Sequence, residues 1–368
     1  MHIIARPAQD RSAATSKLTA YLDGARSRSG GALNRIMNEV PHDQLVKASK
    51  LEFASEPEGV EYIAPDGNNF ALHGNALQQI AQRAHVPMDY IRHLQDQKSD
   101  WAHSLLGRTL TDHYAAMDPN MRVLTRTVGT QTRAVLSDSF KRIDARPGLN
   151  TLAEIATGTG WIISDAVATD TRVSVRFLSP QLHEITPGEF VLLGMGWSNS
   201  DYGRGASDLQ EFILRLWCLN GAMAESSLRQ IHLGRKMSGE DIRFSDRTQR
   251  LMSAAEIAAL RDAGRQIMGV ERAQDRVGKL TAAASTPVNP EAKLADLRKR
   301  VGKALAKEVA DAYNRPDVEN LPAGQTAWRW SNALSWVAGH TDDAETRLDL
   351  EQEAGKALDA VSKPRADA

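Results

Sequence analysis

The sequence predicts an α+β protein: a mixed, largely antiparallel β-rich core with flanking helices, followed by a helical C-terminal region. Two patterns lead to this fold class. Between residues 50 and 240, short segments rich in β-branched residues alternate with glycine-containing turns, which is typical of paired strands. After about residue 245 the apolar residues follow helical spacing, and four prolines separate the helices: Pro287, Pro290, Pro316 and Pro322.

The composition limits the classes of function. Of the 368 residues, 42% are hydrophobic and 25% charged, which supports a sizeable core in one large domain or two. The net charge is −1, so a nucleic-acid surface would have to be a local patch. The single cysteine, Cys218, excludes a disulfide framework and a multi-cysteine metal site and suits a reducing compartment. The sequence shows no signal-peptide core and no run of about 18 apolar residues, so we expect a cytoplasmic protein without a membrane partner.

The chain divides into four parts. Residues 1–31 are rich in Arg, Ser and Ala, and we expect a flexible basic arm with one short helix near residues 15–22. Such an arm can contact nucleic acid, but most are only solvated chain ends. The other parts are the α+β core domain, the helical region and a polar tail: 32–244, 245–360 and 361–368.

The first half of the core domain reads as two hairpins with helices between them. Strands at 60–63 and 69–72 flank Asp66-Gly67, a strong turn signal. Three helices follow, the second starting at a proline: 75–83, 87–94 and 101–117. The second hairpin has strands on either side of Gly129: 121–128 and 133–136.

The rest of the chain continues this pattern and then becomes helical. One helix, at 148–157, precedes three β-rich segments: 161–169, 171–178 and 189–197. The C-terminal region is expected to hold four helical stretches: 245–282, 290–315, 324–340 and 343–360. The stretch that carries Trp328, Trp330 and Trp336 has an apolar face broad enough to pack on the core or on another subunit.

A glycine- and aromatic-rich segment at 194–221 is the feature around which we expect the core to be arranged. Its glycines can take positive φ or let a ligand approach the backbone: Gly194, Gly196, Gly203 and Gly205. Trp197 and Tyr202 could stack on bases, with core packing as the alternative, and Arg204 could hold a phosphate. Trp217 lies in an apolar run and is expected in the core. The segment matches neither a Walker loop nor a dinucleotide fingerprint, so we expect no cofactor.

Residues 122–146 form a basic hairpin. They carry six cations against two carboxylates, Asp138 and Asp144, a local excess of four positive charges. Arg122 and Arg126 are an even number of residues apart, so on a strand both would face the same way and could track phosphates. The alternative is a solvated face or ion pairs with acidic helices. The six cations are Arg122, Arg126, Arg133, Lys141, Arg142 and Arg146.

A second basic cluster follows between Arg229 and Arg250 and includes Arg235 and Lys236. Acidic residues are interspersed in it, so a solvated face is the main interpretation and nucleic-acid binding the alternative. The histidines do not have the spacing of a metal-binding motif, and we expect no metal site.

Four passages together resemble the phage/plasmid-like family known as domain of unknown function 932, over about residues 51–358. They are RAHVPMDYIRHL (83–94), TRTVGTQTRAVLSDSFKRID (125–144), WSNSDYGRGASD with RLWCLNGA (197–208 and 215–222), and WRWSNALSWVAGHTDD (328–343). The third passage carries the family's polar and glycine positions: Asn199, Ser200, Gly203, Cys218, Asn220 and Gly221. The chain departs from the family where Asp138-Ser139-Phe140 replace a basic residue followed by Tyr. The resemblance implies a setting in mobile elements, near recombination genes, and no settled activity.

Three functional hypotheses follow. The first is a non-enzymatic single-stranded DNA-binding protein that anneals strands in recombination and self-assembles as a homo-oligomer. The second is an enzyme acting on nucleotides or nucleic acid, with a phosphate on the glycine loop and chemistry at Ser137, Asp138 or His232. The third is a structural or host-interaction protein, in which charge reversal in the basic hairpin would have no effect.

Overall fold

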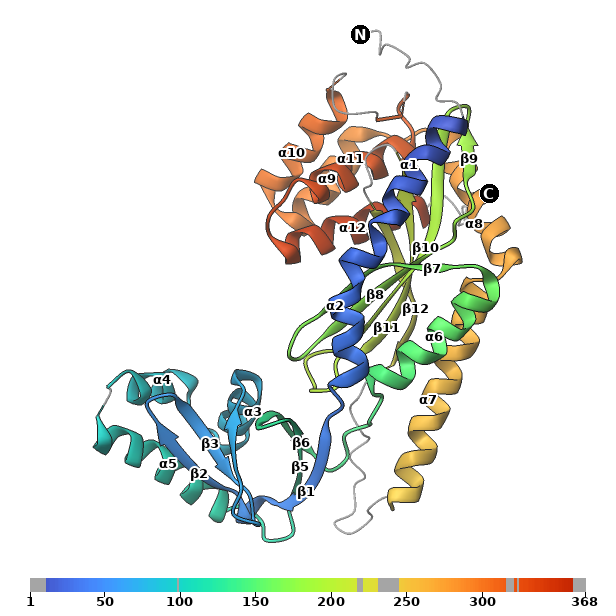
Figure 1. Cartoon of the computed structure of the whole chain (residues 1–368). Helices are drawn as coiled ribbons and strands as arrows, with labels where there is room; N and C mark the ends of the chain where they lie inside the picture. The colour runs from blue at the N-terminus through green and yellow to red at the C-terminus, as the bar shows by residue number, and fades with distance from the viewer. Residues whose placement is uncertain are drawn as a thin grey trace, which may run out of the picture.

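The computed structural model describes residues 11–97, 99–216, 221–230, 245–315, 321–322 and 324–359. This part of the chain holds two mostly antiparallel sheets, two N-terminal helices and a helical C-terminal region, so the predicted α+β class is confirmed. Figure 1 shows the first sheet and its helices below the second sheet, whose β7–β8 and β10–β11 turns lie at the end that faces it. The described residues do not include Trp217, Cys218, Asn220, His232, Arg235, Lys236 or the predicted tail at 361–368.

The first sheet, called sheet A here, has the strand order β1-β5-β6-β4-β3-β2. Its strands are β1 (His42–Lys47), β2 (Glu52–Glu56), β3 (Gly59–Ile63), β4 (Asn69–Leu72), β5 (Arg122–Val128) and β6 (Gln131–Ser137). Neighbours pair antiparallel except β4 and β6, which pair in parallel. Both predicted hairpins are confirmed, and their turns contain Gly67 and Gly129 at φ of 86° and 59°.

Three helices cover one face of sheet A: α3 (Gly74–Ala84), α4 (Met88–Asp96) and α5 (Asp100–Ala115). They begin and end close to the predicted positions, because apolar residues at helical spacing mark each buried stripe. Ile80, Ile91 and Leu110 are fully buried in the core that these helices form with Val123 and Val135 of the sheet.

The second sheet, sheet B, has the order β12-β11-β10-β8-β7, and β9 pairs with β10 outside this path. Its strands are β7 (Ile162–Ala168), β8 (Val173–Leu178), β9 (His183–Thr186), β10 (Glu189–Asn199), β11 (Ser207–Arg215) and β12 (Gly221–Gln230). Strands β7, β8 and β10 lie within the three predicted β-rich segments or extend them by two residues. The helix before β7 is α6 (Ala145–Thr159).

The expectation of a flexible N-terminal arm is wrong for residues 11–31. They form α1 (Arg11–Asp23) and the first part of α2 (Ala25–Asn38), which packs along β7. The basic residues explain this, because Arg28 and Arg35 donate to the carbonyls of Ser164 and Ala168 at 3.3 and 3.2 Å. Helix α2 therefore covers the open edge of sheet B, and its arginines provide hydrogen-bond donors for two carbonyls of β7.

The C-terminal helices share their core with sheet B. They are α7 (Asp246–Ile267), α8 (Val270–Ser285), α9 (Pro290–Val301), α10 (Lys303–Asn314), α11 (Ala327–Gly339) and α12 (Ala344–Asp359). Leu260, Trp328 and Leu334 belong to the same buried cluster as Phe177 and Trp197. Each sheet thus has its own hydrophobic core, and the core of sheet B includes residues on both sides of the predicted boundary at residue 244.

We predict opposite effects for two alanine substitutions in α6. A Cβ on Gly148 would lie 2.6 Å from the Trp197 ring, whereas Gly158 has nothing within 4 Å. Gly148→Ala should lower the free energy of unfolding by about 1–3 kcal/mol because the core must shift. Gly158→Ala should raise it by up to about 1 kcal/mol through helix propensity. Urea denaturation measures both, and equal effects would contradict the packing described here.

Candidate functional site

The two sheets meet where α3 lies between β6 and the β10–β11 turn. The Asn75 amide donates to the carbonyls of Arg133 and Tyr202, both at 3.0 Å. Gln79 donates to the same Tyr202 carbonyl at 2.9 Å and accepts from the Val135 N–H at 2.8 Å. Two amide side chains of one helix therefore satisfy the backbone of a strand and a turn that belong to different sheets.

Arg126 lies at the centre of this junction and is 1% exposed. Its guanidinium donates to Asp43 and Asp144 at 2.7 Å each and to the Asp201 carbonyl at 2.7 Å. Burial works to lower the pKa of Arg126, but the carboxylates of Asp144 and Asp43 outweigh it and hold the pKa above its usual value. The side chain joins β5, β1, the start of α6 and the β10–β11 turn.

The Asp201 carboxyl is buried beside this arginine. Its Oδ1 accepts from the Ala145 N–H at 2.9 Å and from the Asn199 amide at 2.8 Å. Burial, together with the negative charge of Asp144, raises the pKa of Asp201 to about 7. Because its hydrogen bonds fix the first turn of α6, we assign Asp201 a structural role.

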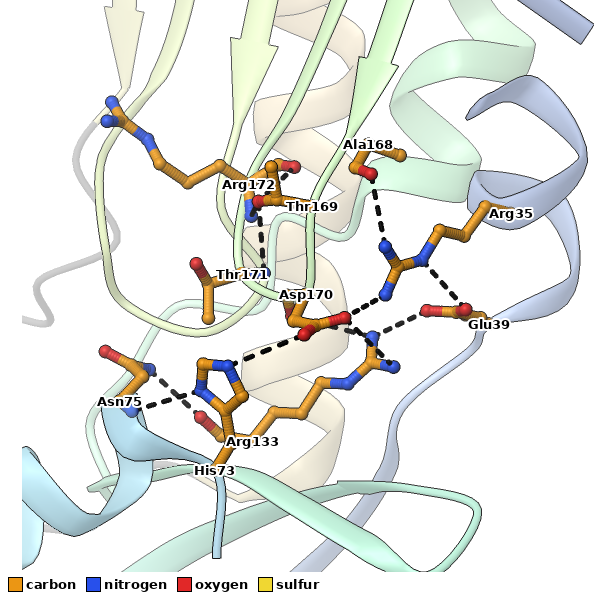
Figure 2. A network of polar contacts seen from close by, with 10 residues as sticks. All are labelled: Arg35, Glu39, His73, Asn75, Arg133, Ala168, Thr169, Asp170, Thr171 and Arg172. Atoms are coloured by element: carbon orange, nitrogen blue, oxygen red, sulfur yellow. Dashed lines mark hydrogen bonds and ion pairs between the residues drawn. The ribbon is translucent and has the colours of Figure 1, made fainter. Parts of the chain in front are cut away.

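A second polar network surrounds Asp170, at the tip of the β7–β8 turn (Figure 2). Its carboxylate pairs with Arg35 of α2, with Arg133 of β6 at 3.8 Å and with His73 at 3.6 Å. Glu39 accepts from Arg35 and Arg133 at 2.8 and 2.6 Å. The hydrogen bond from Arg35 lowers the pKa of Asp170, and hydrogen bonds from Arg133 and Arg35 lower that of Glu39 against its desolvation.

His73 uses both ring nitrogens within this network. Nδ1 accepts from the Asn75 N–H at 3.0 Å and caps α3, so the proton of the neutral ring is on Nε2, which faces Asp170. The lone pair of Nδ1 is occupied by the Asn75 N–H, so this nitrogen is not free to take a proton from a nucleophile.

The interpretation of Arg122 and Arg126 as one exposed row is therefore wrong. Arg126 is opposite Asp43 in the sheet register, and Arg133 is 8% exposed and paired with Glu39. The predicted alternative of ion pairs holds for these two arginines. It also holds for two others, which pair with acidic groups outside the hairpin: Lys141 with Glu256 at 3.0 Å and Arg142 with Asp43 at 3.2 Å. Arg122 and Arg146 are exposed.

Base stacking on Trp197 and Tyr202 is also corrected. Trp197 is 0% exposed and its indole N–H donates to Ser207 at 3.1 Å. Tyr202 is 6% exposed, with the Arg133 guanidinium 5.7 Å from its ring centre. Trp197 points inward because β10 is buried along most of its length. Tyr202 lies in the β10–β11 turn and packs in a buried cluster with Leu136 and Phe140, so neither ring offers a face to a base.

The loop in the glycine-rich segment is shorter than predicted. Gly194 and Gly196 lie within β10, and a Cβ on Gly194 would meet the Phe212 ring at 2.3 Å. Of the four glycines only Gly203 has positive φ, at 76°. Gly221 is the first residue of β12.

The family-like positions in this segment hold the turn in place. Asn199 donates to the Ile143 carbonyl at 2.8 Å. Ser200 donates to the Thr171 carbonyl at 2.7 Å and accepts from the Arg204 N–H at 2.9 Å. These bonds connect the β10–β11 turn with the β7–β8 turn, and they preorganise the exposed residues that follow.

Two exposed arginines lie on either side of this turn. The Arg204 guanidinium donates to the Gln78 amide oxygen at 3.3 Å. The Arg172 guanidinium passes Gly205, where a Cβ would lie 3.3 Å from it, and Figure 2 shows this side chain extending away from the Asp170 network. The sequence pattern does not single out Arg172, because it lies in the segment 171–178 that predicts a strand. The signal that could have revealed it is the polar turn Thr169–Arg172 between two β-rich segments.

A second pair of exposed cations lies on sheet A. Lys47 of β1 and Arg122 of β5 are cross-strand partners, and both are exposed. Like charges directly opposite each other destabilise a sheet. Lys47 was also missed, because only the strand order shows that it lies beside Arg122.

Of the residues in the enzymatic hypothesis, the structure describes Ser137 and Asp138, and His232 lies outside the described residues. Ser137 Oγ lies 3.0 Å from Ser139 Oγ, and the Asp138 carbonyl accepts from Gln249. Within the described residues no three His, Cys, Asp or Glu side chains are grouped as metal ligands. The described helices include none with the length and apolar character needed to cross a bilayer.

Comparison with known proteins adds no relative: no family model, no curated protein and no solved structure matches the chain. The resemblance to domain of unknown function 932 stays a prediction from the four passages.

Removing the buried guanidinium should strongly destabilise the protein. Arg126→Met leaves Asp43 and Asp144 without their cation and should lower the free energy of unfolding by about 3–5 kcal/mol. Arg122→Met, on the exposed end of the same strand, should change it by less than about 0.5 kcal/mol. Urea denaturation of both variants tests this, and a tolerated Arg126→Met would refute the role given to Arg126.

Asp201 should make stability depend on pH. Its pKa is about 7 when folded and near 3.8 when unfolded, so the folded state binds the extra proton and Asp201 lowers stability as pH rises from about 4 to 7. Asp201→Asn keeps an oxygen for Ala145 and cannot ionise. Its unfolding free energy relative to wild type should rise across this range and level off above pH 7. Parallel pH curves for the two proteins would contradict the assignment.

Proposed function

We propose that the protein binds single-stranded DNA without catalysing a reaction, through phosphate contacts at the β10–β11 turn. The observation that carries this proposal is the presence of two exposed arginines at Gly205: Arg204 precedes it in the chain, and the Arg172 guanidinium lies beside it. The resemblance to a family of mobile elements is consistent with a role in recombination, where strand annealing and self-assembly would be part of the activity.

The chemistry of the turn suits a phosphate. Guanidinium groups form paired hydrogen bonds to phosphate oxygens. Gly205 has no side chain to keep a phosphate away from the backbone beside the Arg172 guanidinium. Gly203 serves the fold instead, because its φ is positive and a Cβ there would lie 2.7 Å from Leu136. Ser200 holds the turn against Thr171, so less conformational entropy is lost on binding.

The cations of sheet A support the same proposal. Lys47 and Arg122 repel each other across β1 and β5, and a phosphate between them would remove that cost. The buried arginines are different, because their carboxylate partners already neutralise them. The exposed cations are therefore available to a polyanion, and the buried ones stabilise the fold.

Charge reversal at the turn should weaken binding. For wild type we expect salt-dependent binding of a labelled single-stranded oligonucleotide, measured by fluorescence anisotropy between 50 and about 200 mM salt. Arg172→Glu/Arg204→Glu should weaken binding by at least about tenfold and reduce the salt slope by about 2. Arg298→Glu/Lys299→Glu, an equal charge change at exposed positions of α9, is the matched control.

Three results would speak against this proposal. One is the absence of wild-type binding at low salt, and another is an equal loss in the control. The third is tighter binding to the duplex than to the single strand, which would indicate a groove-binding protein instead. An unchanged affinity in the turn variant would move the phosphate site elsewhere on the surface.

A further inference from the structure

Helix α3 carries an exposed polar stripe next to the turn. Gln78, Gln82 and His85 are exposed and follow at spacings of four and three residues, so they share one side of the helix end. Over seven residues the stripe is about 10 Å long. The opposite side is buried, with Ile80 and Ala81 in the core of sheet A. Gln78 accepts from Arg204, so the stripe starts at the proposed phosphate site.

His85 has a conformation that favours glycine. Its φ is 56°, and among the described residues it is the only one other than glycine that has a positive φ. It ends α3 in the left-handed region, where its N–H bonds to the carbonyls of Ala81 and Gln82. Glycine would take this place without steric cost. The chain therefore carries an exposed imidazole at the expense of some stability.

We propose that this stripe, Gln78–Gln82–His85, contacts the bases of single-stranded DNA whose phosphates bind Arg172 and Arg204. The inference rests on the proposed function and adds the surface that reads the bases. Glutamine amides both donate and accept, as the edges of bases require, and an imidazole can stack on a base. These edges are free in a single strand and paired in a duplex, so the stripe also accounts for a preference for single strands.

The choice of occupant follows from the surroundings of the stripe. Its cationic end lies at Arg204 and Arg172, which suits a polyanion. The stripe itself is polar, and it carries no charge when His85 is neutral. Such a surface does not suit a protein partner, because apolar contacts dominate the centre of protein–protein interfaces. A flexible polyanion with hydrogen-bonding bases fits both halves of this surface.

The decisive experiment separates base contacts from phosphate contacts by their salt dependence. Gln82→Ala and Gln78→Ala/Gln82→Ala should weaken binding of a mixed-sequence single strand about three- to tenfold, with a wild-type salt slope, because no phosphate contact is lost. Arg172→Glu/Arg204→Glu should instead reduce the slope. Gln266→Ala, at an exposed amide of α7, is the matched control and should bind as wild type.

His85 supplies a second and independent readout. His85→Gly should raise Tm by about 1–4 °C, because the left-handed conformation costs glycine nothing, and yet weaken binding. His85→Asn, which tolerates this conformation and keeps a hydrogen-bonding group, should retain more affinity than His85→Gly. A purely structural role predicts the higher Tm with unchanged affinity.

The outcomes distinguish this inference from the proposed function. If wild type binds and the arginine variant loses binding, while the Gln82 and His85 variants bind as wild type, only the base-reading role of α3 is overturned. If wild type does not bind single strands, both proposals fall. If the glutamine variants change the salt slope as the arginine variant does, α3 acts through Arg204, and direct contact with the bases is refuted.

Discussion

The arrangement of the two sheets depends on the burial of Arg126. Its guanidinium meets Asp43 of β1, Asp144 before α6 and the Asp201 carbonyl of the β10–β11 turn. Removing a cation from water is costly, and only well-placed partners repay that cost. Because the partners come from both sheets, a displacement of one sheet against the other would break the bond to the Asp201 carbonyl and remove part of the set that solvates a buried charge. The interaction thus restricts the junction to one geometry.

The exposed turn inherits this order. The Tyr202 carbonyl accepts hydrogen bonds from two side-chain amides of α3. The Ser200 hydroxyl donates to a carbonyl of the β7–β8 turn. Arg204 follows directly, so its backbone is anchored although its side chain is exposed. A site on a rigid turn loses less entropy on binding than one on a free loop. Stability at the junction and the geometry of the proposed site therefore have a common origin.

Helix α3 combines three roles through its three sides. One side packs into the core of sheet A, and Asn75 and Gln79 on the second bond to the edge of β6. The third side faces solvent beside Arg204 and carries the proposed base contacts. Contact of a strand with the third side would add to interactions that already hold the two sheets together, so binding and the order of the junction should reinforce each other.

Local chemistry in the sequence determined the hairpins around Gly67 and Gly129 and the helices on sheet A, because turn residues and apolar spacing act over a few residues. It also predicted the helical character of the C-terminal region, but the stretches 245–282 and 290–315 are each divided between two helices in the structure. It also determined the excess of positive charge at 122–146 and the glycine turn.

Only the tertiary structure decided which cations stay exposed. Asp43 lies 83 residues from Arg126, and that pairing requires the order of strands in sheet A. The same holds for Trp197, whose burial depends on α6 and the C-terminal helices. Long-range packing selects among charged and aromatic residues that look equivalent in the sequence, and so it places the site.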